Sequence, residues 1–364
     1  PQSGQMKVAG VPYRSVWREA DRVAIIDQTR LPFEFHTLRI SDCDEITQAI
    51  RSMQVRGAPL IGATAAYGIA LAMSADASDA SLRLAAELLG NARPTAVNLR
   101  WAIERMTQRL HAIAPPARAD AAWMEAENIA DEDVACNLAI GRHGLELLRG
   151  IASRKGSVNV LTHCNAGWLA TVDVGTALAP IYLAHDEGIP VHVWVDETRP
   201  RNQGLLTTWE LSQHGVPNTL IADNAGGHLM QREQVDLVIV GADRVTAAGD
   251  VCNKIGTYLK ALAAKDCAVP FYAAVPSPTI DWSIDDALRE IPIEERSGAE
   301  VTTMAVMDTD NRAAHARIAP DGTRAANPAF DVTPARLVTA IITDRGIAPA
   351  SREGLHDLYR RKVA

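Results

Sequence analysis

The segment VNVLTHCNAG at residues 158–167 begins with a mostly apolar run at residues 158–162, predicted to be a strand, and ends in polar residues and glycine. Similar apolar runs follow it, and amphipathic stretches fill the gaps between them; these runs cover residues 191–195, 219–222, 237–240 and 269–274. Continuous apolar strands that alternate with helices are typical of a parallel sheet with both faces covered. The second half of the chain is therefore predicted to be an α/β domain.

The first half of the chain has a different pattern. Between residues 13 and 40, apolar and polar residues alternate in short runs that break at Leu31-Pro32, which indicates a small antiparallel β-meander. From residue 41 to about 149 the pattern turns helical. Asp42 or Asp44 can cap a helix that runs to Met53, and Pro59 opens an almost wholly apolar helix. The helices expected after Met53 cover residues 60–73, 79–89, 95–112 and 120–149.

The chain is long enough for two domains, because its 364 residues exceed the usual size of a single core. A polar, glycine-punctuated segment at residues 149–157 separates the two patterns. We predict an α/β fold with a small N-terminal β-meander plus helical domain, residues 6–154, followed by a Rossmann-like parallel-sheet domain, residues 155–364. Residues 1–5 are interpreted as a tag remnant.

Composition and charge narrow the class of function. A net charge of −8 provides no general basic field for nucleic acid or anionic lipid, and no run of 18 apolar residues indicates a membrane span. Five scattered cysteines are typical of a reducing cytoplasm rather than a disulfide framework. The G-x-G-x-x-G fingerprint is missing after the first strand, and neither C-x-x-C nor H-E-x-x-H occurs. We therefore expect no nicotinamide cofactor, no zinc and no nucleic-acid or membrane partner.

Two residues at predicted strand ends are candidates for chemistry, because ligands bind at the carboxyl ends of parallel strands. Cys164 follows the first strand, and a helix predicted to begin near Gly167 or Trp168 would favour its thiolate through the helix dipole. The alternative is a small buried apolar residue. Asp243 follows the run 237–242, where partial desolvation would raise its pKa and suit it to general acid catalysis. Alternatively, it pairs with Arg244 or caps a turn.

Three other segments have features of anion binding. The sequence RGAP at residues 56–59 combines an arginine and a glycine with a helix start, where free N–H groups attract phosphate. Asn253 and Lys254 precede a helix predicted at 255–264 in the same way. The loop 196–204 gathers two acids, two arginines, an asparagine and a glutamine at a strand end, which favours ligand contact. For Arg93 the residue pattern alone indicates a surface ion pair.

Together these segments resemble the methylthioribose-1-phosphate isomerase family. The resemblance rests on six motifs in the expected order and extends from about residue 13 to residue 344; they are VRGAP (55–59), RPTAVNL (93–99), THCNAG (162–167), ETRPRNQG (197–204), GADR (241–244) and NKIGTY (253–258). It implies an enzyme of methionine salvage that converts 5-methylthioribose 1-phosphate into 5-methylthioribulose 1-phosphate without a cofactor, as a homodimer.

The resemblance also implies a role for individual residues. Asp243 is similar to the family's proton donor and Cys164 to its second catalytic residue. Seven positions are similar to substrate contacts: Arg56, Gly57, Ala58, Arg93, Gln203, Asn253 and Lys254. The same superfamily includes regulatory subunits of a translation initiation exchange factor, in which the Cys and Asp pair is lost. Ribose-1,5-bisphosphate isomerase is a nearer alternative, because it shares the pair and the phosphate-facing motif.

The chemistry of such a substrate explains why the site needs both Asp243 and Cys164. A 1-phosphate blocks the anomeric oxygen, so ring opening requires an acid at the ring oxygen, and we assign that role to Asp243. Cys164 then either removes the C2 proton or stabilises charge during a hydride shift, and the sequence leaves both routes open. It also leaves open the 5-substituent, although Trp168, Leu205 and Trp209 are candidates to contact it.

Overall fold

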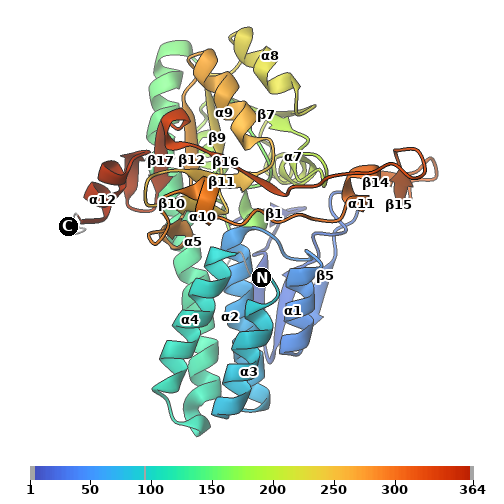
Figure 1. Ribbon diagram of the computed structural model, residues 1–364, viewed down its shortest axis with the longest axis vertical. Coiled ribbons are helices and arrows are strands. Elements are labelled where there is room, and N and C mark those ends of the chain that lie inside the picture. Colours follow the sequence, from blue (N-terminus) through green and yellow to red (C-terminus); the bar gives the residue numbers. More distant parts are fainter. Residues whose placement is uncertain (1–4, 94–95, 361–364) are drawn as a thin grey trace.

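The computed structural model describes residues 5–93 and 96–360. Its helical lobe and its sheet lobe lie one above the other, and a thin hairpin arm extends sideways from the sheet lobe (Figure 1). Residues 1–4, which belong to the proposed tag remnant, and Pro94-Thr95 of the RPTAVNL motif lie outside the described residues.

The β-meander is confirmed. Strands β3 (Val16–Glu19), β4 (Arg22–Ile26) and β5 (Thr37–Ile40) form a three-stranded antiparallel sheet, and the interval between β4 and β5 contains the predicted break. A short hairpin of β1 (Lys7–Val8) and β2 (Val11–Pro12) precedes it, and the sequence pattern did not predict this hairpin.

Five helices follow, close to the predicted ranges; they are α1 (Cys43–Arg51), α2 (Ala58–Ala75), α3 (Asp79–Gly90), α4 (Val97–His111) and α5 (Pro115–Lys155). The N-cap of α1 is Asp42, which accepts a hydrogen bond from the Glu45 backbone N–H. By length and composition α2 could cross a membrane, yet 78% of it is buried inside the protein. It packs against α1, α3, α4 and α5, so its apolar sequence is explained by a central place in the helical lobe.

The longest helix, α5, connects the two lobes. Its 41 residues pack against α2 and α4 in the helical lobe and against α6 (Ala179–Asp186) in the sheet lobe. Gly156 ends the helix in a left-handed conformation, with φ of 81°. Because one helix belongs to both lobes, the domain boundary at residues 154–155 stays a prediction.

The main sheet has the strand order β18-β17-β12-β9-β6-β7-β8. All pairings are parallel except that between β17 and β18. The strands are β6 (Val158–Thr162), β7 (Val191–Asp196), β8 (Asn218–Ile221), β9 (Leu237–Val240), β12 (Phe271–Ala274), β17 (Ala340–Thr343) and β18 (Gly346–Pro349). The chain moves outward from β6 to β8 and then returns to the other side of β6 as β9. The gap between the ends of β6 and β9 is therefore the switch point at which α/β sheets bind ligands.

Smaller elements complete the sheet lobe. A four-stranded sheet, in the order β13-β10-β11-β16, begins directly after the Asp243 position; its strands are β10 (Arg244–Thr246), β11 (Val251–Lys254), β13 (Ile280–Asp281) and β16 (Phe330–Thr333). The projecting arm is the hairpin of β14 (Thr303–Met307) and β15 (Ala313–Arg317). The helices of this lobe that were not yet named are α7 (Gly204–Gln213), α8 (Ala225–Gln231), α9 (Thr257–Asp266), α10 (Ala287–Glu290), α11 (Ala299–Thr302) and α12 (Arg352–Arg360).

Candidate active site

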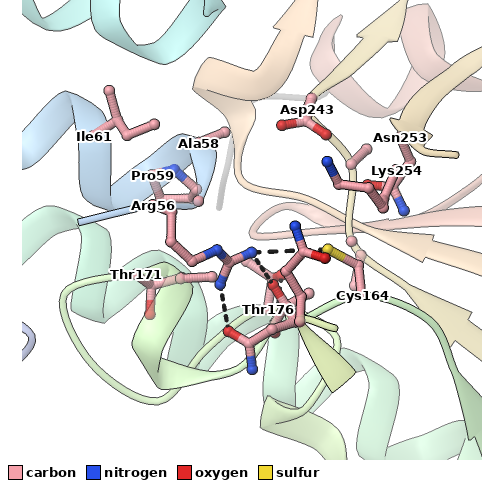
Figure 2. A pocket seen from close by; sticks show the side chains of 18 of the residues that line it. Arg56, Ala58, Pro59, Ile61, Cys164, Thr171, Thr176, Asp243, Asn253 and Lys254 are labelled. Carbon is pink, nitrogen blue, oxygen red and sulfur yellow. Dashed lines mark hydrogen bonds between the residues drawn. The ribbon is translucent and has the colours of Figure 1, made fainter. Parts of the chain in front are cut away.

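A pocket at the switch point contains all nine residues that the sequence singled out. It lies between the start of α2 and the carboxyl ends of β6 and β9, and Figure 2 shows Cys164, Asp243 and Lys254 across it from Arg56. The nine residues are Arg56, Gly57, Ala58, Arg93, Cys164, Gln203, Asp243, Asn253 and Lys254. Segments far apart in the sequence thus form one polar cavity.

Two hydrogen bonds made by its backbone hold Cys164 in position. Its N–H donates to Thr198 Oγ1 at 2.9 Å, and its carbonyl accepts from Thr207 Oγ1 at 2.9 Å. The residue has φ of 67°, a left-handed conformation that costs about 1–3 kcal/mol for a residue with a side chain. Such strain persists only where the surroundings impose it, and here both hydrogen bonds do so.

The helix expected at Gly167 or Trp168 is wrong. Residues 168–170 form a single 3-10 turn, η1 (Trp168–Ala170), and the next α-helix, α6, begins at Ala179. The intervening loop folds back on itself, with Gly167 paired to Gly175 and the Thr176 N–H donating to the Ala166 carbonyl. Positive charge near the sulfur comes instead from Arg56, whose Nη2 lies 3.8 Å from Cys164 Sγ.

Contacts with the loop that follows Cys164 explain the positions of Arg56 and Gly57. Arg56 donates from Nη1 to Asn165 Oδ1 at 2.6 Å and from Nη2 to the Asn165 carbonyl at 2.8 Å. Gly57 has φ of 98°, and a Cβ there would lie 2.5 Å from the Ala170 Cα, so a side chain would collide with η1. Glycine therefore allows the start of α2 to approach the Cys164 loop.

Asp243 faces the pocket directly after β9. Burial raises the pKa of its carboxyl, while the positive charges of Lys254, Arg93 and Arg56 act in the opposite direction. Burial also lowers the pKa of Lys254, whose ammonium lies 4.7 Å from the centre of the Phe330 ring. The pocket therefore combines a carboxyl that retains its proton to higher pH with several cationic groups.

The remaining predicted contacts come from both lobes. Arg93 forms an ion pair with Glu294 at 3.3 Å, as its residue pattern indicated, but its side chain is largely buried in the pocket wall. Asn253 donates to Thr257 Oγ1 at 3.1 Å. Within the part of the chain that the structure describes, Gln203 Oε1 is buried and has no hydrogen-bond partner. A buried acceptor of this kind is suited to a ligand hydroxyl.

Sequence reasoning gave no individual role to several residues that support or line this pocket. They include Asn165, Thr198, Thr207, Glu210 and Glu294. A partial signal existed for two of them, because Thr207 and Glu210 lie three apart and therefore share one face of α7, on which both are buried. Trp168 and Trp209, which were candidates for the 5-substituent, pack in the apolar core instead, and only Leu205 lines a cavity next to the pocket.

A cluster of possible metal ligands lies behind Cys164. His163 Nδ1 is 2.8 Å from Asp196 Oδ2 and 4.0 Å from Asp223 Oδ1, although the sequence spacing gives no hint of this. Lys260 Nζ lies 3.2 Å from the same Asp196 oxygen. The Lys260 ammonium therefore already pairs with the Asp196 carboxylate, and the geometry is that of a buried ion-pair network.

An open parallel sheet with a polar pocket at its switch point is the arrangement of an α/β enzyme for small molecules. The profile of the "Initiation factor 2 subunit family" matches residues 54–350. The crystal structure of the translation initiation factor eIF-2B subunit delta from A. fulgidus superposes with a TM-score of 0.79, at 40% identity over 96% of this chain and 100% of that one.

Several similar proteins share one name, and they narrow the class of enzyme within this family. The methylthioribose-1-phosphate isomerases of Gluconobacter oxydans and Rhodospirillum rubrum are 63% and 62% identical, over 97% and 98% of this chain and 98% and 94% of theirs. The 5-methylthioribose 1-phosphate isomerase of Pyrococcus horikoshii has a TM-score of 0.85 at 41% identity, over 99% of this chain and 98% of that one. The chain belongs to the initiation factor 2 subunit family, and within it to the methylthioribose-1-phosphate isomerases, which confirms the resemblance inferred from its motifs.

Proposed function

We propose that the chain isomerises 5-methylthioribose 1-phosphate to 5-methylthioribulose 1-phosphate in methionine salvage, with Asp243 and Cys164 as its catalytic pair. The observation that carries the proposal is that both residues face one cavity across the sheet's switch point, beside three cationic side chains. The name shared by the similar proteins supports the choice of substrate.

Asp243 is suited to protonate the ring oxygen. Burial raises the pKa of its carboxyl, so the acid form persists to higher pH than for an exposed aspartate. The proton passes to the ring oxygen as the bond between that oxygen and C1 breaks, while the phosphate stays attached to C1. Hydrogen then moves from C2 to C1, and the 2-hydroxyl gives up its proton, which restores the acid form of Asp243, to give the ketose.

Cys164 has one of two roles in the hydrogen transfer. As a thiolate it removes the C2 proton and yields an enol phosphate; alternatively, a hydride moves directly and the sulfur stabilises charge. Deuterium placed at C2 distinguishes the routes in ordinary water. Loss of deuterium to solvent requires the proton-transfer route, whereas complete retention at C1 in wild-type enzyme, and in variants with a more open pocket, contradicts it.

We assign the phosphate to the cationic side of the pocket. Arg56, Arg93 and Lys254 carry the charge, and the N–H groups at the start of α2, at Gly57 and Ala58, provide further donors. Gln203 and Asn253 are left to bind the sugar hydroxyls, because both are buried amides that line the same cavity. All seven predicted substrate contacts thereby receive a role.

The 5-substituent distinguishes this proposal from the bisphosphate alternative. A second cavity of about 520 Å³ shares Met53, Arg56 and Gln203 with the first, and its wall includes apolar side chains such as Leu206 and Met304. Apart from Arg56, which is assigned to the 1-phosphate, its arginines pair with acids: Arg201 with Glu300 at 3.0 Å, and Arg30 with Glu34 at 3.1 Å. Apolar side chains in the wall, together with arginines that are already paired, favour an apolar methylthio group over a second phosphate.

The deciding experiment measures turnover of 5-methylthioribose 1-phosphate, 5-deoxyribose 1-phosphate and ribose 1,5-bisphosphate in parallel. We expect the highest kcat/KM for the methylthio sugar and a modest loss for the deoxy sugar, since apolar contacts discriminate by only about 10- to 200-fold. A preference for the bisphosphate would overturn the substrate assignment, and inactivity toward all three would overturn the isomerase assignment.

We further propose a cytoplasmic homodimer. All five cysteines are free, as expected for a reducing compartment. Light scattering on the purified protein should give twice the chain mass of 39.2 kDa. A mass of 39.2 kDa at micromolar concentration would contradict the dimer.

A further inference from the structure

Glu210 is a buried acid that the proposed mechanism does not use. It lies on α7 with 1% of its surface exposed, and both carboxylate oxygens accept hydrogen bonds. The Tyr182 hydroxyl and the Trp168 N–H donate to Oε1 at 2.8 and 3.0 Å. Asn165 Nδ2 and the Leu169 N–H donate to Oε2 at 3.1 and 3.3 Å. Four donors directed at two oxygens match the ionised carboxylate, which is the acceptor-only form.

The carboxylate determines the path of the loop that follows Cys164. A Cβ on Gly167 would lie 1.5 Å from Glu210 Oε1, so the chain passes directly over the acid. The next two backbone N–H groups, of Trp168 and Leu169, both point at it. A purely structural core position would be filled at lower cost by an apolar side chain, because a buried charge is expensive unless fully hydrogen-bonded.

The network continues from Glu210 into the pocket through Asn165. The amide nitrogen of Asn165 donates to Glu210 and to Thr207 Oγ1, which in turn donates to the Cys164 carbonyl. Because the nitrogen faces Glu210, the amide oxygen must face the other way, where Arg56 Nη1 donates to it at 2.6 Å. Arg56 Nη2 then lies 3.8 Å from Cys164 Sγ.

We propose that Glu210 is a positioning residue, which acts through Asn165 to hold Arg56 and Cys164 in the arrangement that the reaction requires. The inference rests on the proposed function for its kinetic consequences but not for its geometry. Burial raises the pKa of Glu210 to about 7, so the carboxylate form predominates only above about pH 7. Tyr182 is the titratable group in contact with it, and burial raises the pKa of this phenol well above its ordinary value.

The first test replaces one acceptor oxygen with a donor. In Glu210→Gln the new NH₂ group meets the Asn165 and Leu169 donors, or the Trp168 and Tyr182 donors, and the loop must shift. We expect kcat to fall about 100-fold, because a displacement of about 1 Å has this effect on an aligned active site. KM should rise at the same time, since Arg56 loses its fixed orientation. Unchanged kcat and KM would overturn the proposal.

A compensating double variant tests whether the effect passes through Asn165. In Glu210→Gln with Asn165→Asp the hydrogen-bond polarity is reversed, so the new amide donates to the new carboxylate, which still accepts from Arg56. We expect Asn165→Asp alone to be impaired, because two carboxylates then face each other, and the double variant to exceed it in kcat by at least about tenfold. Independent, multiplicative losses would contradict a pathway through Asn165. This comparison also serves if Glu210→Gln alone does not fold.

A readout without substrate separates this inference from the proposed function. The alkylation rate of Cys164 by iodoacetamide, followed by peptide mass spectrometry, should change in Glu210→Gln, while that of the half-buried Cys267 stays constant. The control is Asp133→Asn on α5, since burial raises the pKa of Asp133 to about 7 as well, but its partners are Val172 and Asn137. Asp133→Asn should leave Cys164 alkylation and kcat within about twofold. Equal changes in both variants would indicate general destabilisation and overturn the positioning role.

Discussion

At the scale of single residues, Asp243 provides the most direct prediction. Asp243→Asn keeps the shape of the side chain but removes the acid, so kcat should fall by at least about 10²- to 10⁴-fold. KM should change little, because the cationic side of the pocket is intact. Steady-state kinetics with 5-methylthioribose 1-phosphate test this expectation, and near-normal turnover would remove Asp243 from the mechanism.

Arg56 should affect binding more than a surface arginine does. Arg56→Ala removes charge-assisted hydrogen bonds worth about 1.5–3 kcal/mol, which corresponds to a roughly 10- to 150-fold weaker affinity for the 1-phosphate. The matched control is Arg39→Ala, which removes an exposed ion pair with Glu19 on the β-meander and should leave affinity unchanged. Calorimetry with substrate in the Asp243→Asn background measures both, and equal affinities would place the phosphate elsewhere.

At the scale of elements, the close contact between the start of α2 and η1 determines the shape of the pocket. Gly57→Ala combines an unfavourable φ of 98° with a Cβ 2.5 Å from Ala170. We expect a loss of about 1–3 kcal/mol in the free energy of unfolding together with a fall in kcat/KM, because η1 and the Cys164 loop must move.

A second glycine separates backbone strain from collision. Gly322 also has a positive φ, of 75°, but, apart from its chain neighbours, none of the atoms at residues 5–93 and 96–360 lies within 4 Å of a Cβ built there. Gly322→Ala should therefore destabilise through strain alone and leave kcat/KM intact. Thermal denaturation and kinetics on both variants test the difference, and a normal kcat/KM for Gly57→Ala would show that the contact is not needed for catalysis.

At the scale of the whole molecule, buried acids should make stability depend on pH. Burial raises the pKa of Glu210 and Asp133 to about 7, from ordinary values of 4.5 and 3.8. The folded protein holds these protons more tightly than the unfolded chain does. The two groups therefore stabilise the fold below pH 4, and this contribution is lost as the pH rises to about 7.

Glu210→Gln should remove the part of the pH dependence of stability that comes from Glu210. For Glu210 the difference in the free energy of unfolding between pH 4.5 and pH 8 is expected to be about 3 kcal/mol. Urea denaturation of wild type and variant across this range should show the free energy of unfolding of the wild type falling by about 3 kcal/mol more than that of the variant. A constant offset at every pH would mean that the carboxyl does not titrate in this window.

Much of the fold followed from local patterns in the sequence. Strands β6 and β9 matched their predicted ranges because both are short runs rich in β-branched and apolar residues. Of the two predicted caps of α1, Asp42 and Asp44, the structure has Asp42, whose side chain bonds within one turn. The helix predicted at Gly167 was wrong for a non-local reason. Glu210, more than 40 residues further along the chain, binds the Trp168 and Leu169 N–H groups, and the pairing of Gly167 with Gly175 turns the chain back after a single 3-10 turn.

The sequence by itself determined the chemistry available to this protein: the cysteine and aspartate at strand ends, the arginine and glycine at a helix start, and the motifs that place the chain in its family. Only the tertiary structure decided how these groups meet. Arg56 replaces a helix dipole beside Cys164, Glu294 pairs with Arg93, and Glu210 orients Asn165. Each of these contacts joins residues more than 40 positions apart, and local periodicity carries no information about which distant side chains share a buried space.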